Sequence, residues 1–223
     1  MNKLAVVLMS GGMDSALCAA IAKSDGYDIA ALHLNYGQRT QKREEKAFID
    51  LCDFYAVKHK LIVDVGYFKQ IGGSSLTDPN IEVPEAKFNK NEIPNTYVPF
   101  RNGNILAIAA SWAETLGAEA IYIGAVEQDS SGYPDCRAEF FQAYQNAINL
   151  GTRPETNLKI ITPIIHLSKK EIVQQGVLLN VPLYLTWSCY TREDAACGKC
   201  ESCLLRLRGF EQAGYRDPIR YVE

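Results

Sequence analysis

The sequence lacks the features that carry a protein to a membrane or to nucleic acid. Its N-terminal apolar run, residues 4–9, ends in two glycines instead of a cleavage-like site. No apolar stretch approaches the roughly 20 residues that cross a bilayer. The formal net charge of −3 gives no general attraction to a phosphate backbone. We therefore expect a cytoplasmic protein with no membrane or nucleic-acid partner, acting on a small molecule.

Histidine is scarce as well, and the three histidines do not have the spacing of metal ligands. His33 follows apolar strand residues, so we expect a satisfied core or edge histidine there and not a nucleotide contact. Three of the seven cysteines, Cys18, Cys52 and Cys136, stand apart from the others. We interpret each of them as a small buried thiol.

Apolar and turn-forming segments alternate along most of the chain. The pattern predicts strands over 4–9, 28–34, 60–65, 120–124 and 158–162, and helices over 15–24, 38–55, 103–116, 138–150 and 169–179. This alternation favours an α/β fold with a doubly wound, mainly parallel sheet. Residues 66–99 are rich in Gly, Pro, Asn and Asp without a clear period, which indicates a long loop or lid.

The segment "SGGMDS", residues 10–15, lies between the first predicted strand and helix. Such a turn presents unpaired backbone N–H groups and the positive end of the helix dipole, so it attracts anions. Ser10 and Ser15 can add hydroxyl donors. The segment contains no lysine, so it is not a GxxxxGK[ST] phosphate loop, and it does not match GxGxxG either. A tight glycine turn capped by Ser10 and Asp14 is the alternative interpretation.

The same six residues resemble the SGGxDS signature of the PP-loop ATP pyrophosphatases, whose fold is PP-loop or HUP-like. That resemblance implies that ATP is broken between its α and β phosphates, with AMP transferred to a substrate oxygen. It implies catalytic roles for Ser10, Asp14 and Ser15, with Asp14 helping to hold Mg²⁺. The expected ATP-binding residues are Leu8, Met9, Ser10, Gly11, Gly12, Met13, Asp14, Ser15, Ala16, Leu17 and Cys18.

The remaining four cysteines, Cys189, Cys197, Cys200 and Cys203, have the spacing C-x7-C-x2-C-x2-C. Four thiolates at this spacing can converge on one ion, and structural Zn²⁺ is the simplest occupant. An iron–sulfur cluster and a redox dithiol remain alternatives. We expect a nucleotide-binding domain over 1–185 and a zinc-binding segment over 186–223, packed together as one compact unit.

Glycine loop and cysteine cluster together resemble the family of 7-cyano-7-deazaguanine synthases, the nitrile-forming enzymes of the queuosine pathway. The resemblance covers essentially the whole chain. It includes the segments "HLNYGQR", "VPFRN", "DSSGYPDCR", "SKKEI" and "SCY", in this order.

The resemblance implies an ATP-dependent ligase that joins 7-carboxy-7-deazaguanine and ammonia through an adenylated acid and then an adenylated amide. Free ammonium is the expected nitrogen source, because no glutaminase-like segment is present. The family also implies a homodimer.

Residues that bind the deazaguanine are less clearly marked. Asp135 can accept two hydrogen bonds from the guanine-like edge, with Arg137 balancing charge; a turn with a surface ion pair fits equally well. Arg101 precedes a helix at a place suited to an anion. Lys169 and Lys170 either reach phosphate or lie in a solvated first helical turn.

Two other functions fit parts of the sequence. A PP-loop enzyme that adenylates tRNA for thiolation would need an RNA-binding surface and a sulfur-handling cysteine. A non-catalytic nucleotide-binding module would use the cysteine cluster to dock a partner. Product analysis with and without each substrate separates these functions.

Overall fold

The computed structural model describes residues 3–84, 93–127 and 132–222. Its centre is a five-stranded sheet in the order β3-β2-β1-β4-β5, and every neighbouring pair of strands is parallel. The strands are β1 Lys3–Leu8, β2 Tyr27–Asn35, β3 His59–Asp64, β4 Ala120–Ile123 and β5 Lys159–Ile161. The predicted doubly wound α/β fold is confirmed.

Helices connect the strands. The helices are α1 Met13–Ser24, α2 Gln41–Phe54, α3 Phe68–Ile71, α4 Arg101–Leu116, α5 Ala138–Gly151, α6 Lys169–Leu178 and α7 Glu201–Ala213, with 3-10 turns η1 Pro134–Cys136 and η2 Leu183–Leu185. Five of these helices match the predicted ones within a few residues. Helix α7 was not predicted, although the apolar residues Leu204, Leu207 and Phe210 have helical spacing and Gly214 ends the helix.

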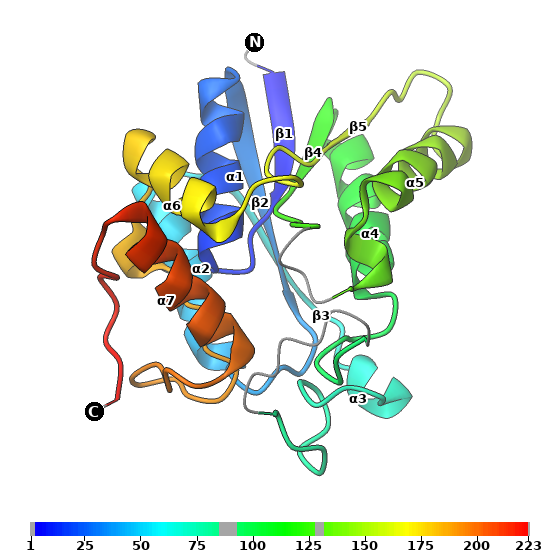
Figure 1. The fold of residues 1–223 in the computed structure, drawn as a ribbon. Helices are drawn as coiled ribbons and strands as arrows, with labels where there is room; N and C mark the ends of the chain where they lie inside the picture. Colours follow the sequence, from blue (N-terminus) through cyan, green and yellow to red (C-terminus); the bar gives the residue numbers. More distant parts are fainter. Residues whose placement is uncertain (1–2, 85–92, 128–131, 223) are drawn as a thin grey trace.

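Alternate residues of the buried strands point to opposite faces of the sheet. In β1, Ala5 and Val7 join the core under α1, α2 and α6, whereas Val6 and Leu8 join the core under α4 and α5. Figure 1 shows these two helical layers on either side of the strands. A strand buried on both faces is continuously apolar, which is why β1 and β2 are readable from the sequence.

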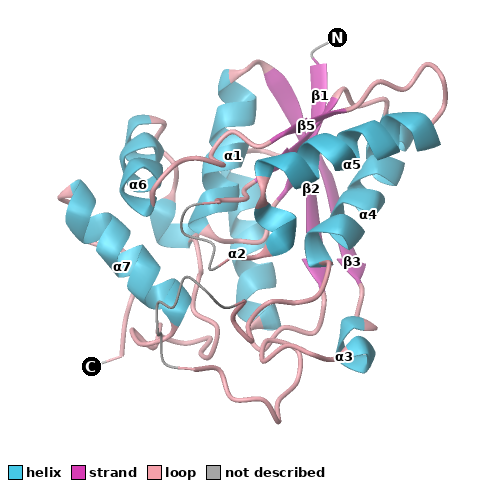
Figure 2. Cartoon of the chain, turned by 45° about the vertical axis from the view of Figure 1, so that its right-hand side comes forward, coloured by secondary structure: helices cyan, strands magenta, loops and turns pink. Residues whose placement is uncertain are grey.

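The strand order reverses between β1 and β4. From β1 the chain moves outward through β2 to β3, and it then returns to the other side of β1 with β4 and β5. Open parallel sheets bind ligands at such a switch point, outside the carboxyl ends of the strands. The loops that follow the strands gather at this end of the molecule (Figure 2).

The long segment 66–99 contains α3 and is otherwise irregular where the structure describes it, and 85–92 lie outside the described residues. Arg39 fastens part of it: its Nε donates to the Ser75 carbonyl at 2.8 Å and its Nη2 to the Ile81 carbonyl at 2.6 Å. Residues 74–81 are thereby held against the start of α2.

Close contact between α6 and α7 attaches the C-terminal segment to the domain. A Cβ added at Gly209 would lie 3.0 Å from the Lys169 carbonyl oxygen, so the helices can approach this closely only with glycine there. Beyond α7, a parallel bridge pairs Tyr221 with Ala196. None of the helices built from the described residues is long and apolar enough to cross a membrane.

Candidate functional site

A cavity of about 300 Å³ opens at the switch point of the sheet. Its walls come from the ends of β1, β2 and β4, the first turns of α1, α2, α4, α6 and α7, and the segment between η2 and α7. This volume is at the lower end of the range for small-molecule sites. The cavity therefore lies where the topology predicts a ligand site.

The turn between β1 and α1 depends on two close backbone approaches. Gly11 has φ +87°, and a Cβ there would lie 2.7 Å from the Glu44 carbonyl oxygen. On the other side, a Cβ at Gly124 would lie 3.0 Å from the backbone nitrogen of Ser15. Trp187 completes the enclosure, because its backbone N–H donates to the Gly11 carbonyl at 2.8 Å. Three distant segments thus fix one short loop.

Polar groups of this loop face the cavity. The hydroxyl oxygens of Ser10 and Ser15 lie 3.2 Å apart, and the Ser15 hydroxyl also donates to the Gly12 carbonyl at 3.0 Å. Gly12 is the N-cap of α1 and brings no side chain to the first amides of the helix. Those amides and the helix dipole offer an anion the binding site that the sequence predicts.

A lysine of α6 reaches the edge of this loop. Lys169 Nζ lies 2.7 Å from Asp14 Oδ2, although the two residues are 155 positions apart. Both side chains are largely shielded from solvent, with exposed fractions of 14% for Lys169 and 28% for Asp14. The structure thus favours the phosphate-reaching interpretation of Lys169 over a solvated helical turn.

Asp14 also has a carboxylate oxygen available to bind a cation. Its Oδ1 atom is buried and has no hydrogen-bond partner among the described residues. A carboxylate oxygen in this state suits a hard divalent cation beside phosphates. The expected Mg²⁺ role of Asp14 therefore fits the residues present.

The predicted ATP-binding residues divide into two groups. Those that line the cavity are Leu8, Met9, Ser10, Gly12, Met13, Asp14 and Ser15. Ala16, Leu17 and Cys18 are fully buried in the core behind the first turn of α1, and Gly11 contacts α2. Their assignment to nucleotide binding stays a prediction.

Of the three predicted substrate residues, Arg101 lines the cavity, Asp135 lies close enough to Arg101 for their charges to interact, and Arg137 faces solvent. Arg101 lines the cavity, with its guanidinium over the Tyr36 ring at 5.4 Å. Asp135 is buried and caps α4, because its Oδ2 accepts the Asn102 backbone N–H at 2.9 Å. Arg137 is exposed and pairs with Glu139 at 2.9 Å. Neither Asp135 nor Arg137 is among the described residues that line the cavity.

Sequence reasoning missed Glu44, which lines the cavity from the first turn of α2. Burial raises its pKa to about 7, although hydrogen bonds from Thr40 and Gln38 and the charge of Arg101 act in the opposite direction. Burial also raises the pKa of Tyr36 to about 12. A half-buried carboxylate beside an arginine is a common feature of functional sites.

His33 also lines the cavity, but it is 1% exposed and packs in the core. Its Nδ1 lies 2.9 Å from the Met9 carbonyl, and its ring stacks on Phe48 at 5.0 Å. Burial lowers its pKa, so the imidazole is neutral and Nδ1 carries the proton that the carbonyl accepts. The expectation of a core histidine is confirmed, except that Nε2 has no partner among the described residues.

The four clustered cysteines converge as their spacing predicts. The Sγ atoms of Cys189, Cys197, Cys200 and Cys203 all lie within 4.8 Å of one another. Cys197 and Cys203 are 3.8 Å apart at sulfur, which is close to the edge of a tetrahedron with Zn–S bonds of about 2.3 Å.

Backbone N–H groups support these sulfurs. The amide of Cys197 points at Cys189 Sγ from 3.4 Å, and that of Cys200 points at Cys197 Sγ from 3.3 Å. Gly198 makes the turn with φ +71°. Four thiolates with amide donors around them fit a closed structural metal site with no open position.

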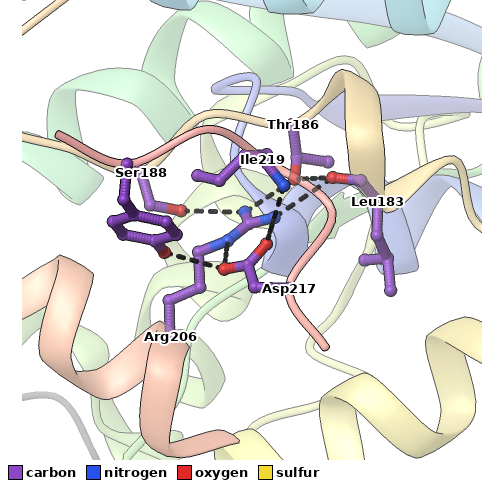
Figure 3. Close-up of polar contacts among 7 residues, drawn as sticks. Leu183, Thr186, Ser188, Arg206, Asp217 and Ile219 are labelled. Atoms are coloured by element: carbon purple, nitrogen blue, oxygen red, sulfur yellow. Dashed lines mark hydrogen bonds and ion pairs between the residues drawn. The ribbon is translucent and has the colours of Figure 1, made fainter. Parts of the chain in front are cut away.

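A buried ion pair joins this cluster to the rest of the molecule (Figure 3). Arg206 of α7, 1% exposed, donates from Nε and Nη2 to the two carboxylate oxygens of Asp217 at 2.7 and 3.0 Å. Its Nη1 donates to the Thr186 hydroxyl at 2.7 Å, and its Nη2 also donates to the Leu183 carbonyl at 3.1 Å. The guanidinium therefore fixes η2, the segment before Cys189 and the C-terminal tail to one another.

Comparisons with known proteins identify the family of the chain. The sequence model of the family described as "Queuosine biosynthesis protein QueC" matches residues 4–214. A 7-cyano-7-deazaguanine synthase from Nautilia profundicola is 60% identical over 221 residues, covering 99% of both chains. One from Campylobacter curvus is 57% identical over 220 residues, covering 99% of this chain and 98% of the relative.

Among solved structures, NMN synthetase from Francisella tularensis is similar in fold, with a TM-score of 0.50. It is 15% identical in sequence, over 95% of this chain and 87% of that one. The chain therefore belongs to the QueC family of queuosine biosynthesis proteins.

Proposed function

We propose that the protein is an ATP-dependent ligase that makes 7-cyano-7-deazaguanine from 7-carboxy-7-deazaguanine and ammonia. The names of its relatives support this activity. The structural observation that carries it is the anion site at the start of α1, with Asp14 and Lys169 at its edge. Such a site can hold the diphosphate that leaves when AMP is transferred.

ATP is needed because ammonia cannot displace oxide from a ring carboxylate. Ser10, Ser15 and the first amides of α1 bind the outer phosphates, and Lys169 balances their charge. A carboxylate oxygen attacks the α-phosphorus, the bond to diphosphate breaks, and an acyl adenylate forms. Ammonia then attacks the carbonyl carbon, a proton is lost, and AMP leaves the amide.

The same site serves a second activation. The amide oxygen attacks the α-phosphorus of another ATP, and the amide nitrogen loses a proton. Cleavage of the carbon–oxygen bond with loss of the remaining N–H proton releases AMP and leaves the nitrile. Two ATP thus give two AMP and two diphosphate for each nitrile.

Two metals accompany this proposal. Asp14, through its unpartnered Oδ1, would hold Mg²⁺. When bound, Mg²⁺ supplies neutralising charge to the departing diphosphate. Cys189, Cys197, Cys200 and Cys203 would hold Zn²⁺ as a structural ion. Elemental analysis that finds iron in place of zinc would contradict this assignment.

Further parts of the proposal follow the sequence and the family resemblance. They are free ammonium as the nitrogen source, a cytoplasmic location, a homodimer, and a division into residues 1–185 and 186–223. Arg101, Asp135 and Arg137 are proposed to act in substrate binding. Light scattering tests the homodimer.

Incubation with Mg-ATP, ammonium and 7-carboxy-7-deazaguanine tests the function, with products identified by mass spectrometry. We expect AMP and the nitrile only when the carboxy substrate is present. AMP formed only with tRNA would indicate a thiolation-type enzyme, and no product with either would indicate a non-catalytic module. Release of ADP and orthophosphate would overturn the proposal.

A further inference from the structure

One carboxylate in the cavity has no part in the phosphate chemistry. Glu44 lies in the first turn of α2, and its own carbonyl oxygen packs against Gly11 of the phosphate loop. Glu44 lines the same cavity as Ser10 and Asp14. A charged group held beside a nucleotide site suits the recognition of a second ligand.

Two neighbours hold the Glu44 carboxylate in place. The Thr40 hydroxyl donates to Oε1 at 2.7 Å, and Gln38 Nε2 donates to Oε2 at 3.2 Å. Each oxygen therefore accepts one hydrogen bond from the protein and keeps a second acceptor position. A planar carboxylate that keeps an acceptor position on each oxygen can receive a ligand that offers two parallel N–H donors.

The guanine ring presents this pattern. Its N1–H and 2-amino N–H groups point the same way, and its O6 acceptor lies beside them. Arg101 lines the cavity and is close enough to Glu44 for its charge to act on that carboxylate. An arginine that donates to O6 and a glutamate that accepts from the two N–H groups would complement the whole edge.

The other acidic residues are less suitable. Asp14 is paired with Lys169. Asp135 gives one oxygen to the α4 backbone, at 2.9 Å from the Asn102 nitrogen. Glu201 also lines the cavity, but it opens α7, where the helix dipole by itself favours a negative charge.

We propose that Glu44 reads the N1–H and 2-amino edge of the deazaguanine, with Arg101 on O6, and so determines which base the enzyme accepts. This inference rests on the proposed function for the identity of the base. Recognition of the N1–H and 2-amino edge by Glu44 of α2 leaves the carboxyl group, at the opposite end of the ring system, free to approach ATP.

The test measures binding, so that it does not depend on turnover. Calorimetric titrations at pH 8, where the Glu44 carboxyl group is ionised, with a non-hydrolysable ATP analogue bound, compare 7-carboxy-7-deazaguanine with its analogue lacking the 2-amino group. The proteins are the wild type, Glu44→Gln, Glu44→Asp, Glu201→Gln and the matched control Glu45→Gln. Glu45 neighbours Glu44 but bonds to Asn35 Nδ2 at 2.7 Å.

In the wild type we expect loss of the amino group to weaken binding about 10- to 100-fold, as for a hydrogen bond to a charged group. Glu44→Gln should bind both compounds within about threefold of each other while keeping its affinity for the ATP analogue. Glu44→Asp, which keeps the charge on a shorter arm, should also bind the carboxy substrate more weakly. Glu45→Gln and Glu201→Gln should discriminate like the wild type.

The proposal is overturned if Glu44→Gln discriminates as the wild type does, if Glu201→Gln alone loses discrimination, or if the wild type does not bind the guanine-like compound. Binding with the expected discrimination but without nitrile formation would refute the proposed function and leave the role of Glu44 standing.

Discussion

Replacing Glu44 by glutamine should stabilise the fold, and by an amount that depends on pH. Burial raises the pKa of this carboxyl group from 4.5 to about 7 in the folded protein. Between these two values the unfolded chain is ionised at this position while the folded protein keeps the proton. Rising pH therefore favours unfolding across this interval, and the effect is complete above pH 7.

The magnitude follows from the shift. Each unit of pKa corresponds to about 1.4 kcal/mol, so the full penalty in the wild type is about 3 kcal/mol above pH 7. Below pH 4.5 both states are protonated and the penalty vanishes. Between pH 5.5 and pH 8 the penalty grows by about 2 kcal/mol. Glutamine does not titrate, so the advantage of Glu44→Gln should grow by the same amount.

Urea denaturation of both proteins at pH 5.5 and pH 8, with zinc present, measures this difference. The comparison removes effects that both proteins share, including thiolate protonation at the cysteine cluster and any constant change in packing. The charges that act on Glu44 are those of Arg101 and Glu193, and neither is altered by the substitution. An advantage that is the same at both pH values, or that shrinks as pH rises, would refute the reasoning.

Three further outcomes are expected. Gly11→Ala should lower the free energy of unfolding by about 2 kcal/mol or more in urea denaturation, because a Cβ at this positive φ would clash with the Glu44 carbonyl. Gly12→Ala, at φ −82°, should lower it by less than about 1 kcal/mol. Equal losses would contradict the geometry. Removal of the metal ion from the cysteine cluster, or Cys189→Ser, should weaken ATP binding measured by calorimetry. The reason is that Trp187, whose amide supports the phosphate loop, lies two residues from Cys189. Unchanged affinity would show that the cysteine cluster does not affect the nucleotide site. Asp217→Asn should destabilise the fold by about 3–5 kcal/mol in the same denaturation assay, because it leaves the Arg206 guanidinium buried without a full counter-charge; a loss below about 1 kcal/mol would show that water reaches the pair.

The sheet was predictable because its central strands β1, β2 and β4 are mostly buried, whereas the edge strands β3 and β5 are more exposed. Continuous apolar runs such as 28–34 mark parallel strands, and the crossover helices fill the intervals between them. The cysteine cluster was predictable for another reason, since its ligands are close in sequence and their chemistry is specific. Helix α7 has an apolar pattern that is typical of a helix, but its N-cap Cys200 and its residue Cys203 belong to the cysteine cluster, which hides the start of the helix in the sequence.

The rest of the site depends on contacts between residues far apart in the chain. Lys169 meets Asp14 only because α6 packs beside α1, and no local pattern indicates which of two adjacent lysines turns inward. Glu44 belongs to a charged first half of α2 that is typical of a solvated helix face. Asp135 lies in a turn that suggests a ligand contact, and the structure shows that one of its oxygens caps α4, so its role in substrate binding stays a prediction.

The tie between Arg206 and Asp217 also bears on how the protein is made. The phosphate loop is synthesised before its support, because Gly11 is held by Trp187, and the Trp187 segment is held by the Arg206 guanidinium, which meets its carboxylate only after Asp217 has been translated. A nascent chain stalled before Asp217 would display the nucleotide-binding signature without the brace that shapes it. Translation of the segment that carries Asp217 must therefore precede the formation of a fully braced nucleotide site.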